Sequence, residues 1–550
     1  KEHGMQRPTL FRLMILGLLT FPNFHIHAAD LLPPDREVPA VVDHYIAEQL
    51  KSSETQTAPL ASDLVILRRT TLDLAGRIPT LAEVEAYLTS TEPDKRVKLV
   101  DRLLSSPDFA FHHANELEAM LMETNTGDRD FLTYLQKAAA EDRPWDEMFR
   151  QIIVGNPDED PEQHAMTFLK KRAGDADQMT NSTSRIFFGV AVNCAQCHDH
   201  PLVSDWKQEH YFGFKSFFDR TYQTARKTLA EKSYGEMKFK TVEGDERTAA
   251  FMFLTGAKIE EPKLELTKDQ KKKADELVKK VMKDKEAAQP PIPEFSPRTE
   301  LAKLALDEKN SRFFSRNIVN RIWARLMGQG LVTPLDQLHS ENPPSHPQLL
   351  DWLTRYTVEN GYHLKPLIRG IVLSDAYARQ SRWEGQGDPP RKYLFAKAQT
   401  RVMTPKQYAL SLYIASSSPE KFPLDVKPED WAKTREGLEN TASGLARQME
   451  YPTEHFQVSV DEALYFSNNA RVQSDFLRDS GDKLVGYLKS KEDPAEIIHN
   501  AFRVTLNREP EPAELSAFQE YIKQRAERPV EGLQQVAWAL LTSPELRFNY

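Results

Sequence analysis

Apolar residues recur at intervals of three and four positions along most of the chain, which is the period of an amphipathic helix. Val97, Val100 and Leu104 keep this interval near the N-terminus, and the segment Phe313–Leu326 keeps it in the second half. Gly328 follows that segment, where a helix end is expected. The chain has 22 glycines and 35 prolines, a ratio that suits helices ended by proline turns. The pattern therefore predicts a mainly α fold.

Two distant stretches carry the same order of helix signals. Residues 77–87 read R-I-P-T-L-A-E-V-E-A-Y, and residues 508–518 read R-E-P-E-P-A-E-L-S-A-F. Downstream, L-L-S-S-P-D-F at 103–109 is echoed by L-L-T-S-P-E-L at 540–546. Each copy predicts a pair of helices with an acidic first turn, which suits the helix dipole. The two stretches are therefore expected to form a structural repeat, with common helix-start and helix-stop signals that arise twice as the alternative.

Two positions match the capping box, in which a Ser or Thr and an acid or amide three residues later satisfy backbone N–H groups at a helix start. Thr80 and Glu83 form the first match, and Ser345 and Gln348 form the second. They predict helices that begin directly after Thr80 and Ser345.

A change of composition divides the chain. Residues 263–285 are dominated by Lys, Glu and Asp and lead into the proline-rich stretch 289–293. A charged run followed by prolines is typical of a solvated helix and a stiff linker. We predict two helical domains joined by a charged, proline-ended linker or insertion, with these bounds: 35–250, 251–297 and 298–550.

The first 29 residues resemble a targeting segment. Arg7 and Arg12 precede the apolar run 13–21, and Ala28 and Ala29 follow it. A basic start, a short apolar middle and small residues predict a secretory signal peptide, with an uncleaved anchor as the alternative. The run is too short to span a bilayer, and no later segment is expected to do so. We therefore expect a periplasmic or secreted protein.

The charge balance bears on partners. The formal net charge is −9, whereas a general nucleic-acid binder needs a positive surface to displace counterions from phosphate. Nucleic acid is therefore not an expected partner.

The only two cysteines of the chain lie in the stretch C-A-Q-C-H-D-H at 194–200. Covalent haem attachment uses two thiols and an imidazole within about one helical turn. Cys194 and Cys197 would form the thioethers, and His198 would be the proximal iron ligand. Export supports this interpretation, because haem is attached outside the cytoplasm. A redox partner protein would then exchange electrons with the site.

The residues around the motif do not determine the haem pocket or the sixth iron ligand. Aromatic side chains follow the motif closely and could line a macrocycle, although such a run is also typical of an ordinary core. The aromatic residues are Trp206, Tyr211, Phe212, Phe214, Phe217 and Phe218. The sixth iron ligand is undetermined, and the candidates are Met166, Met179, Met237, Met252, His200 and His210.

Other chemistry is compatible with the same residues. Zinc would use Cys194 and Cys197 with two of His198, His200 and His210. A disulfide between the cysteines is a third possibility in an oxidising compartment. Carboxylates beside these imidazoles, at positions 199 and 205, would suit acid–base work on an extracellular substrate. In these cases the chain would be a scaffold, a binding protein or a hydrolase without haem.

Several longer stretches resemble one family. L-R-R-T-T-L-D-L-A-G-R-I-P-T at 67–80 and F-G-V-A-V-N-C-A-Q-C-H-D-H-P at 188–201 resemble signatures of the planctomycete cytochrome-C-like domain of unknown function. N-I-V-N-R-I-W-A at 317–324, residues 342–351 and W-A-L-L-T-S-P-E at 538–545 resemble its usual C-terminal companion domain. The resemblance implies export, a mainly helical fold and a c-type haem, but no established reaction.

Overall fold

The computed structural model describes residues 31–550 except 124–126, 156–161, 201–202, 264–265 and 452–457. The predicted signal peptide lies outside the described residues. The structure is 58% helical, with helices α1–α25 and only short two-stranded sheets, which confirms the mainly α prediction. Within the described residues, no helix is both long and apolar enough to cross a membrane.

The first half of the chain is helical. Its helices are α1 (Val38–Ser52), α2 (Asp63–Ala75), α3 (Leu81–Thr89), α4 (Lys95–Ser105), α5 (Pro107–Met122), α6 (Arg129–Ala140), α7 (Trp145–Ile153), α8 (Glu162–Ala165), α9 (Thr167–Lys170), α10 (Ala176–Phe188) and α11 (Gln208–Asp219), with the 3₁₀ turn η2 (Asn193–Gln196) before α11. Thr80 accepts a hydrogen bond from the backbone N–H of Glu83, and the Glu83 side chain accepts one from Thr80. The first capping box is therefore confirmed.

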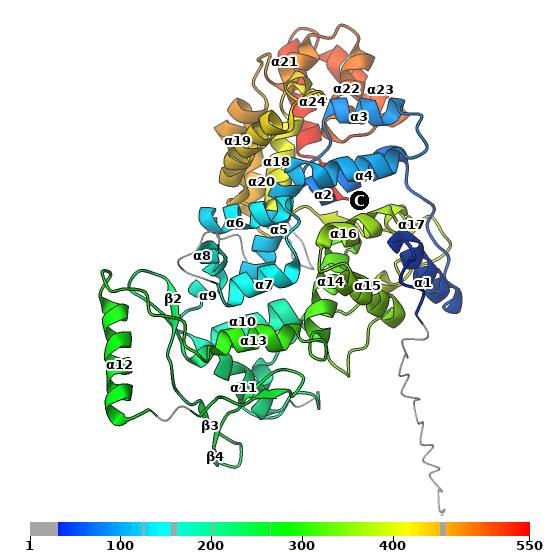
Figure 1. Ribbon diagram of the computed structural model, residues 1–550. Coiled ribbons are helices and arrows are strands. Elements are labelled where there is room, and N and C mark those ends of the chain that lie inside the picture. Colours follow the sequence, from blue (N-terminus) through cyan, green and yellow to red (C-terminus); the bar gives the residue numbers. More distant parts are fainter. Residues whose placement is uncertain (1–30, 124–126, 156–161, 201–202, 264–265, 452–457) are drawn as a thin grey trace, which may run out of the picture.

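Three small antiparallel hairpins and one solvated helix follow α11. They are β1 (Thr221–Gln223) with β2 (Leu229–Glu231), β3 (Lys238–Lys240) with β4 (Glu246–Thr248), β5 (Phe251–Met252) with β6 (Lys258–Ile259), and α12 (Lys268–Lys283). Only Val281 of α12 is buried, and α12 stands apart at the left edge of Figure 1. The charged run thus forms a solvent-exposed helix, as its composition indicates.

The second half is also helical. Its helices are α13 (Pro297–Leu306), α14 (Arg312–Met327), α15 (Pro347–Glu359), α16 (Leu364–Leu373), α17 (Asp375–Ala378), α18 (Pro405–Ala415), α19 (Pro428–Ala446), α20 (Val460–Asn468), α21 (Leu484–Lys489), α22 (Pro494–Thr505), α23 (Pro512–Gln524), α24 (Pro529–Leu541) and α25 (Pro544–Arg547). The strands β7 (Arg401–Val402) and β8 (Phe548–Asn549) pair with each other. The second capping box is wrong, because His346 is the N-cap of α15 and makes no side-chain cap bond.

Two hydrophobic cores hold these helices. The first takes side chains from residues 38–396, so that α13–α16 pack with the N-terminal helices. Trp145 of α7, Phe187 of α10 and Phe314 of α14 stack at its centre, with ring centroids 5.6 and 6.3 Å from Trp145. The second core takes side chains from residues 403–546 together with Leu72, Ile78 and Leu81. Apolar packing therefore joins segments from both sides of the predicted linker, whose exact bounds stay a prediction.

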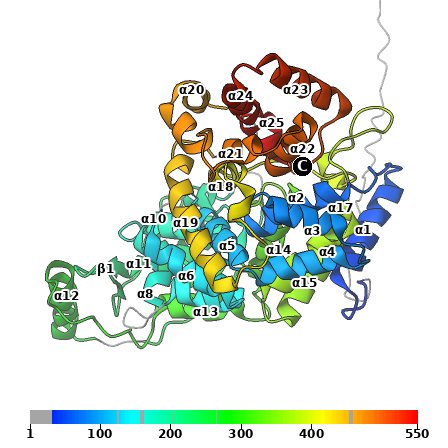
Figure 2. The same ribbon diagram turned by 90° about the horizontal axis from the view of Figure 1, so that it is seen from above.

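The expected repeat is present and lies on the second core. Arg77 pairs with Glu83 and Asp108 at 2.7 and 2.8 Å, and Arg508 pairs with Glu514 and Glu545, both at 2.7 Å. The helices α2–α5 correspond in order to α22–α25. Figures 1 and 2 place α3 close to α22. The two copies thus pack against one another around a shared core.

Candidate functional site

A tight turn at the end of α10 precedes the cysteine motif and joins this part of the chain to its second half. Gly189 ends α10 with a φ of +66°, and a Cβ there would lie 2.6 Å from Leu338 Cδ1. Leu338 donates its backbone N–H to the Gly189 carbonyl at 2.9 Å, and Ala191 donates to the carbonyl of Asp336 at 2.9 Å. Glycine is required because a side chain would meet strain and a clash. These two backbone hydrogen bonds form a joint between the start of the motif and residues 336–338, and they fix the direction of the chain that leads to the cysteines.

The two thiols lie on one exposed turn. Cys194 lies within the 3₁₀ turn η2, and Cys197 is its C-cap residue. Both cysteines are exposed and are not joined to each other. His198 follows directly and is also exposed. The turn thus presents two sulfurs and an imidazole to solvent, next to α11 near the lower end of Figure 1.

The imidazole of His198 has a defined hydrogen position. Its Nδ1 lies 2.6 Å from the backbone carbonyl oxygen of Asp199. A carbonyl oxygen only accepts, so Nδ1 carries a hydrogen, and in the neutral ring Nε2 then keeps its lone pair. Histidines that bind a metal through Nε2 use this arrangement, because the second contact fixes the tautomer and the ring orientation.

The two neighbouring histidines have the opposite arrangement. His200 Nδ1 accepts the backbone N–H of Val203 at 3.0 Å, and His210 Nδ1 accepts that of Lys207 at 3.2 Å. The Nδ1 lone pair of each neutral ring is therefore engaged, and the hydrogen lies on Nε2. Burial, only partly offset by Glu209, lowers the pKa of His210. Neither ring offers a free lone pair for a metal ion in this arrangement.

The carboxylates near the motif hold the loop in place. Asp199 accepts the backbone N–H of Gln208 at 2.9 Å, at the start of α11. Asp205 accepts both the backbone N–H and the hydroxyl of Ser340, at 2.9 and 2.7 Å. Asp199 thus anchors the loop to α11, and Asp205 anchors it to the second half of the chain. These contacts favour a positioning role over paired acid–base catalysis.

Gln208 is a part of the site that the sequence reasoning missed. Its side chain is buried, and its Nε2 lies 3.2–3.4 Å from the carbonyl oxygens of Gln196, Cys197 and Lys240. One amide therefore ties the motif to the hairpin β3–β4. No local sequence signal marks this role, because its partners come from two separate segments, the motif itself and β3.

The aromatic run does not line the motif. Trp206, Tyr211 and Phe214 are buried in the first core, and so are Phe217 and Phe218. Phe214 packs edge-on against Phe188, at a centroid distance of 5.8 Å. Only Phe212 of the run is partly exposed, and it stacks on Phe239 of β3 at 4.4 Å. The aromatic run is thus mainly core, which was the alternative interpretation.

The four methionine candidates for a sixth iron ligand are buried or half-buried. Met166, Met179 and Met252 are buried in apolar surroundings, with 0%, 1% and 5% of their surface exposed. Met237 is half-buried before β3. Across the described ranges, no three or more His, Cys, Asp or Glu side chains are grouped to hold a metal ion. The five residues of the predicted zinc site are accordingly not brought together as a ligand set.

The fold and this turn define a mainly helical protein with an exposed Cys-x-x-Cys-His motif at the joint between its two halves. Residues 41–223 match the family model PSCyt2, a protein of unknown function (DUF1549), and residues 297–522 match PSD1, a protein of unknown function (DUF1553). The chain therefore belongs to the proteins that combine these two families, as the resemblance implied. No curated protein and no solved structure matches the chain.

Proposed function

We propose that the chain is an exported redox protein that holds one c-type haem through Cys194, Cys197 and His198. The two thiols would form the thioether bonds, and His198 Nε2 would be the axial ligand. When bound, such a group supplies one-electron chemistry for electron transfer or for an oxidative step.

The hydrogen position on His198 is the observation that carries this proposal. Two unjoined sulfurs and one imidazole with a free Nε2 lone pair are the donor set that haem attachment needs. Zinc requires a fourth donor in addition to these three, and His200 and His210 both have their Nδ1 atoms engaged by backbone N–H groups. The donor set therefore favours haem over a Cys₂His₂ zinc site.

The protein's own residues prepare the motif for this task. The carbonyl of Asp199 holds the proton on His198 Nδ1, which keeps Nε2 as the coordinating atom. Gln208 and Asp199 fix the loop to α11, so the thiols keep their spacing. Because Cys194, Cys197 and His198 are exposed, an external redox protein has access to the attached group.

The decisive experiment is expression of the full chain in cells with a haem-ligation system. We expect a Soret band that survives acid–acetone extraction. Cys194→Ser with Cys197→Ser should abolish the covalent signal, and His198→Ala should shift the spectrum while attachment remains. His200→Ala is the matched control, because it removes a neighbouring imidazole and should leave the band in place.

A colourless, folded product would contradict the proposal. Metal analysis and a thiol count then separate the remaining possibilities. One equivalent of zinc supports a metal clip, and loss of both free thiols without metal supports a disulfide. Either result would make the chain an extracellular scaffold, binding protein or hydrolase.

A further inference from the structure

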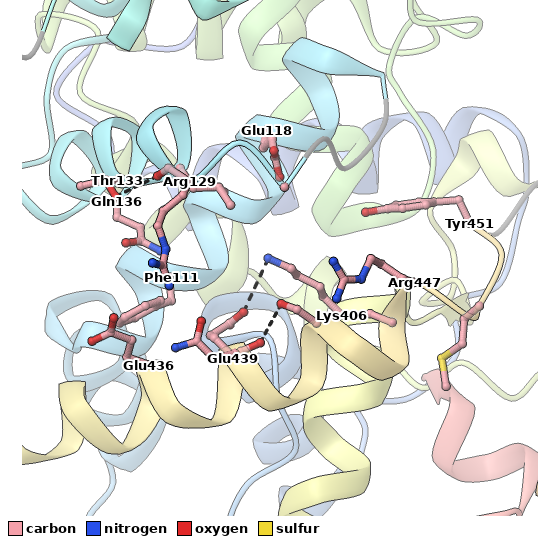
Figure 3. A pocket seen from close by; sticks show the side chains of 16 residues that line it. Phe111, Glu118, Arg129, Thr133, Gln136, Lys406, Glu436, Glu439, Arg447 and Tyr451 are labelled. Carbon is pink, nitrogen blue, oxygen red and sulfur yellow. Dashed lines mark hydrogen bonds and ion pairs between the residues drawn. The ribbon is translucent and has the colours of Figure 1, made fainter. Parts of the chain in front are cut away.

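A large cavity lies away from the cysteine motif, between the two halves of the chain. Its volume is about 610 Å³, and α5, α6, α18 and α19 contribute its walls. Pockets that bind small molecules usually measure about 300–1,000 Å³. Figure 3 shows Phe111 and Tyr451 at opposite sides, with Lys406 and Arg447 next to each other between them.

The charges on the floor of the cavity are already paired within the protein. Lys406 donates to Asn115 Oδ1 at 2.7 Å and lies 3.7 Å from Glu439. Glu439 in turn accepts from Arg435 at 2.7 Å. The floor therefore offers hydrogen-bonding groups held in fixed positions.

Among the described residues, the lining is also electrically balanced. Three cations, Arg129, Lys406 and Arg447, face three carboxylates, Glu118, Glu436 and Glu439. Neutral polar groups lie between them, on Thr133, Gln136, Asn440 and Ser443. An ion of either sign would approach like charges in such a site, whereas a neutral ligand would not.

Hydroxyl groups suit this lining best. A hydroxyl donates one hydrogen bond and accepts two, so it can use the cationic donors and the carboxylate acceptors together. The rings of Phe111 and Tyr451 add apolar surface at both sides. A compact molecule with many hydroxyls and apolar C–H faces meets both requirements.

From this geometry we infer that the cavity binds a neutral saccharide. The carboxylates accept its hydroxyl hydrogens, Lys406 and the two arginines donate to its oxygens, and an aromatic ring packs on its C–H face. The inference does not depend on the proposed haem, since none of the haem-attachment residues lines the cavity.

The test is isothermal titration calorimetry of the full mature chain with neutral di- and trisaccharides of glucose, galactose, mannose and xylose. Glucuronate and glucosamine serve as charged probes of similar shape. We expect at least one neutral saccharide to bind at about 10 mM or below, and more tightly than both charged probes.

Two matched pairs of variants locate the binding. Lys406→Met removes a donor from the floor and should weaken binding about tenfold, whereas Lys433→Met on the exposed face of α19 should not. Asn440→Ala changes an exposed lining residue and should also weaken binding, unlike Thr441→Ala next to it. Unchanged circular dichroism of the Asn440→Ala variant shows that folding is intact.

Three results would overturn the inference. They are the absence of binding by every neutral saccharide, tighter binding of glucuronate or glucosamine than of any neutral sugar, and binding that Asn440→Ala and Lys406→Met leave unchanged.

Discussion

The repeat offers an internal comparison of the same ion cluster at two levels of burial. Arg77, Glu83 and Asp108 have 3%, 5% and 1% of their side-chain surface exposed. Arg508 and its partners Glu514 and Glu545 have 26%, 33% and 26% exposed. Both clusters lie against the second core. Arg77→Met and Arg508→Met therefore each remove a guanidinium group from an ion cluster beside the same core, so their effects on unfolding can be compared directly.

We expect Arg77→Met to lower the free energy of unfolding by about 3 kcal/mol. Breaking a buried ion pair costs about 3–5 kcal/mol, and the lower value applies because both carboxylates keep another cation. Glu83 retains Arg102 at 2.9 Å, and Asp108 retains Arg435 at 2.6 Å. Arg508→Met should cost about 1 kcal/mol, because solvent screens its partly exposed pairs.

The pKa of Glu83 reflects its pairing with Arg77. Burial alone would raise this pKa, but the charge and hydrogen bonds of Arg77 outweigh that effect and lower the pKa to about 2.

Urea unfolding of both variants and the wild type, followed by circular dichroism, measures the two costs in free energy of unfolding. Equal costs, or a larger cost for Arg508→Met, would show that burial does not set the strength of these clusters.

Two further predictions concern pH and the joint beside the motif. Burial lowers the pKa of His346 to about 4, so the unfolded chain takes up its proton first as pH falls below about 6.5. Stability should therefore fall between pH 6.5 and 4, by up to about 3 kcal/mol for this group, and urea midpoints of His346→Leu should show a shallower decline. Gly189→Ala should cost about 2 kcal/mol, because the new Cβ meets Leu338 and Asn317 at a positive φ. Gly387→Ala, with positive φ but open space, should cost less in the same unfolding assay.

Local patterns account for the elements that the sequence predicted well. The segment Phe313–Leu326 becomes α14, Arg312–Met327, with Gly328 in the left-handed conformation at its end. The Thr80 capping box depends on a contact between residues three positions apart, and the repeat shows as two stretches with the same order of residues, so the sequence displays both directly. The box at Ser345 failed because Pro347 occupies the first helical position, which leaves His346 as the N-cap.

The positions of the motif residues on one turn were predictable from the sequence, whereas the residues that hold this turn in place were not. The spacing of Cys194, Cys197 and His198 is visible in the sequence, and the structure places them on one exposed turn. The roles of Asp205 and Gln208 were not visible, because their partners lie elsewhere in the chain. The aromatic run could not be assigned from spacing alone, since a cofactor wall and a helix core show the same periodicity.

The two family regions form one structure because they share a hydrophobic core, and this core also supports the cysteine motif. Trp145 and Phe187 of the first region share a core with Phe314 of the second. Neither region can bury this apolar surface alone. The joint at Gly189 and the contact between Asp205 and Ser340 then carry that shared packing to the loop that bears the cysteines. The second region thus holds the motif in position, although it contributes none of the predicted attachment residues.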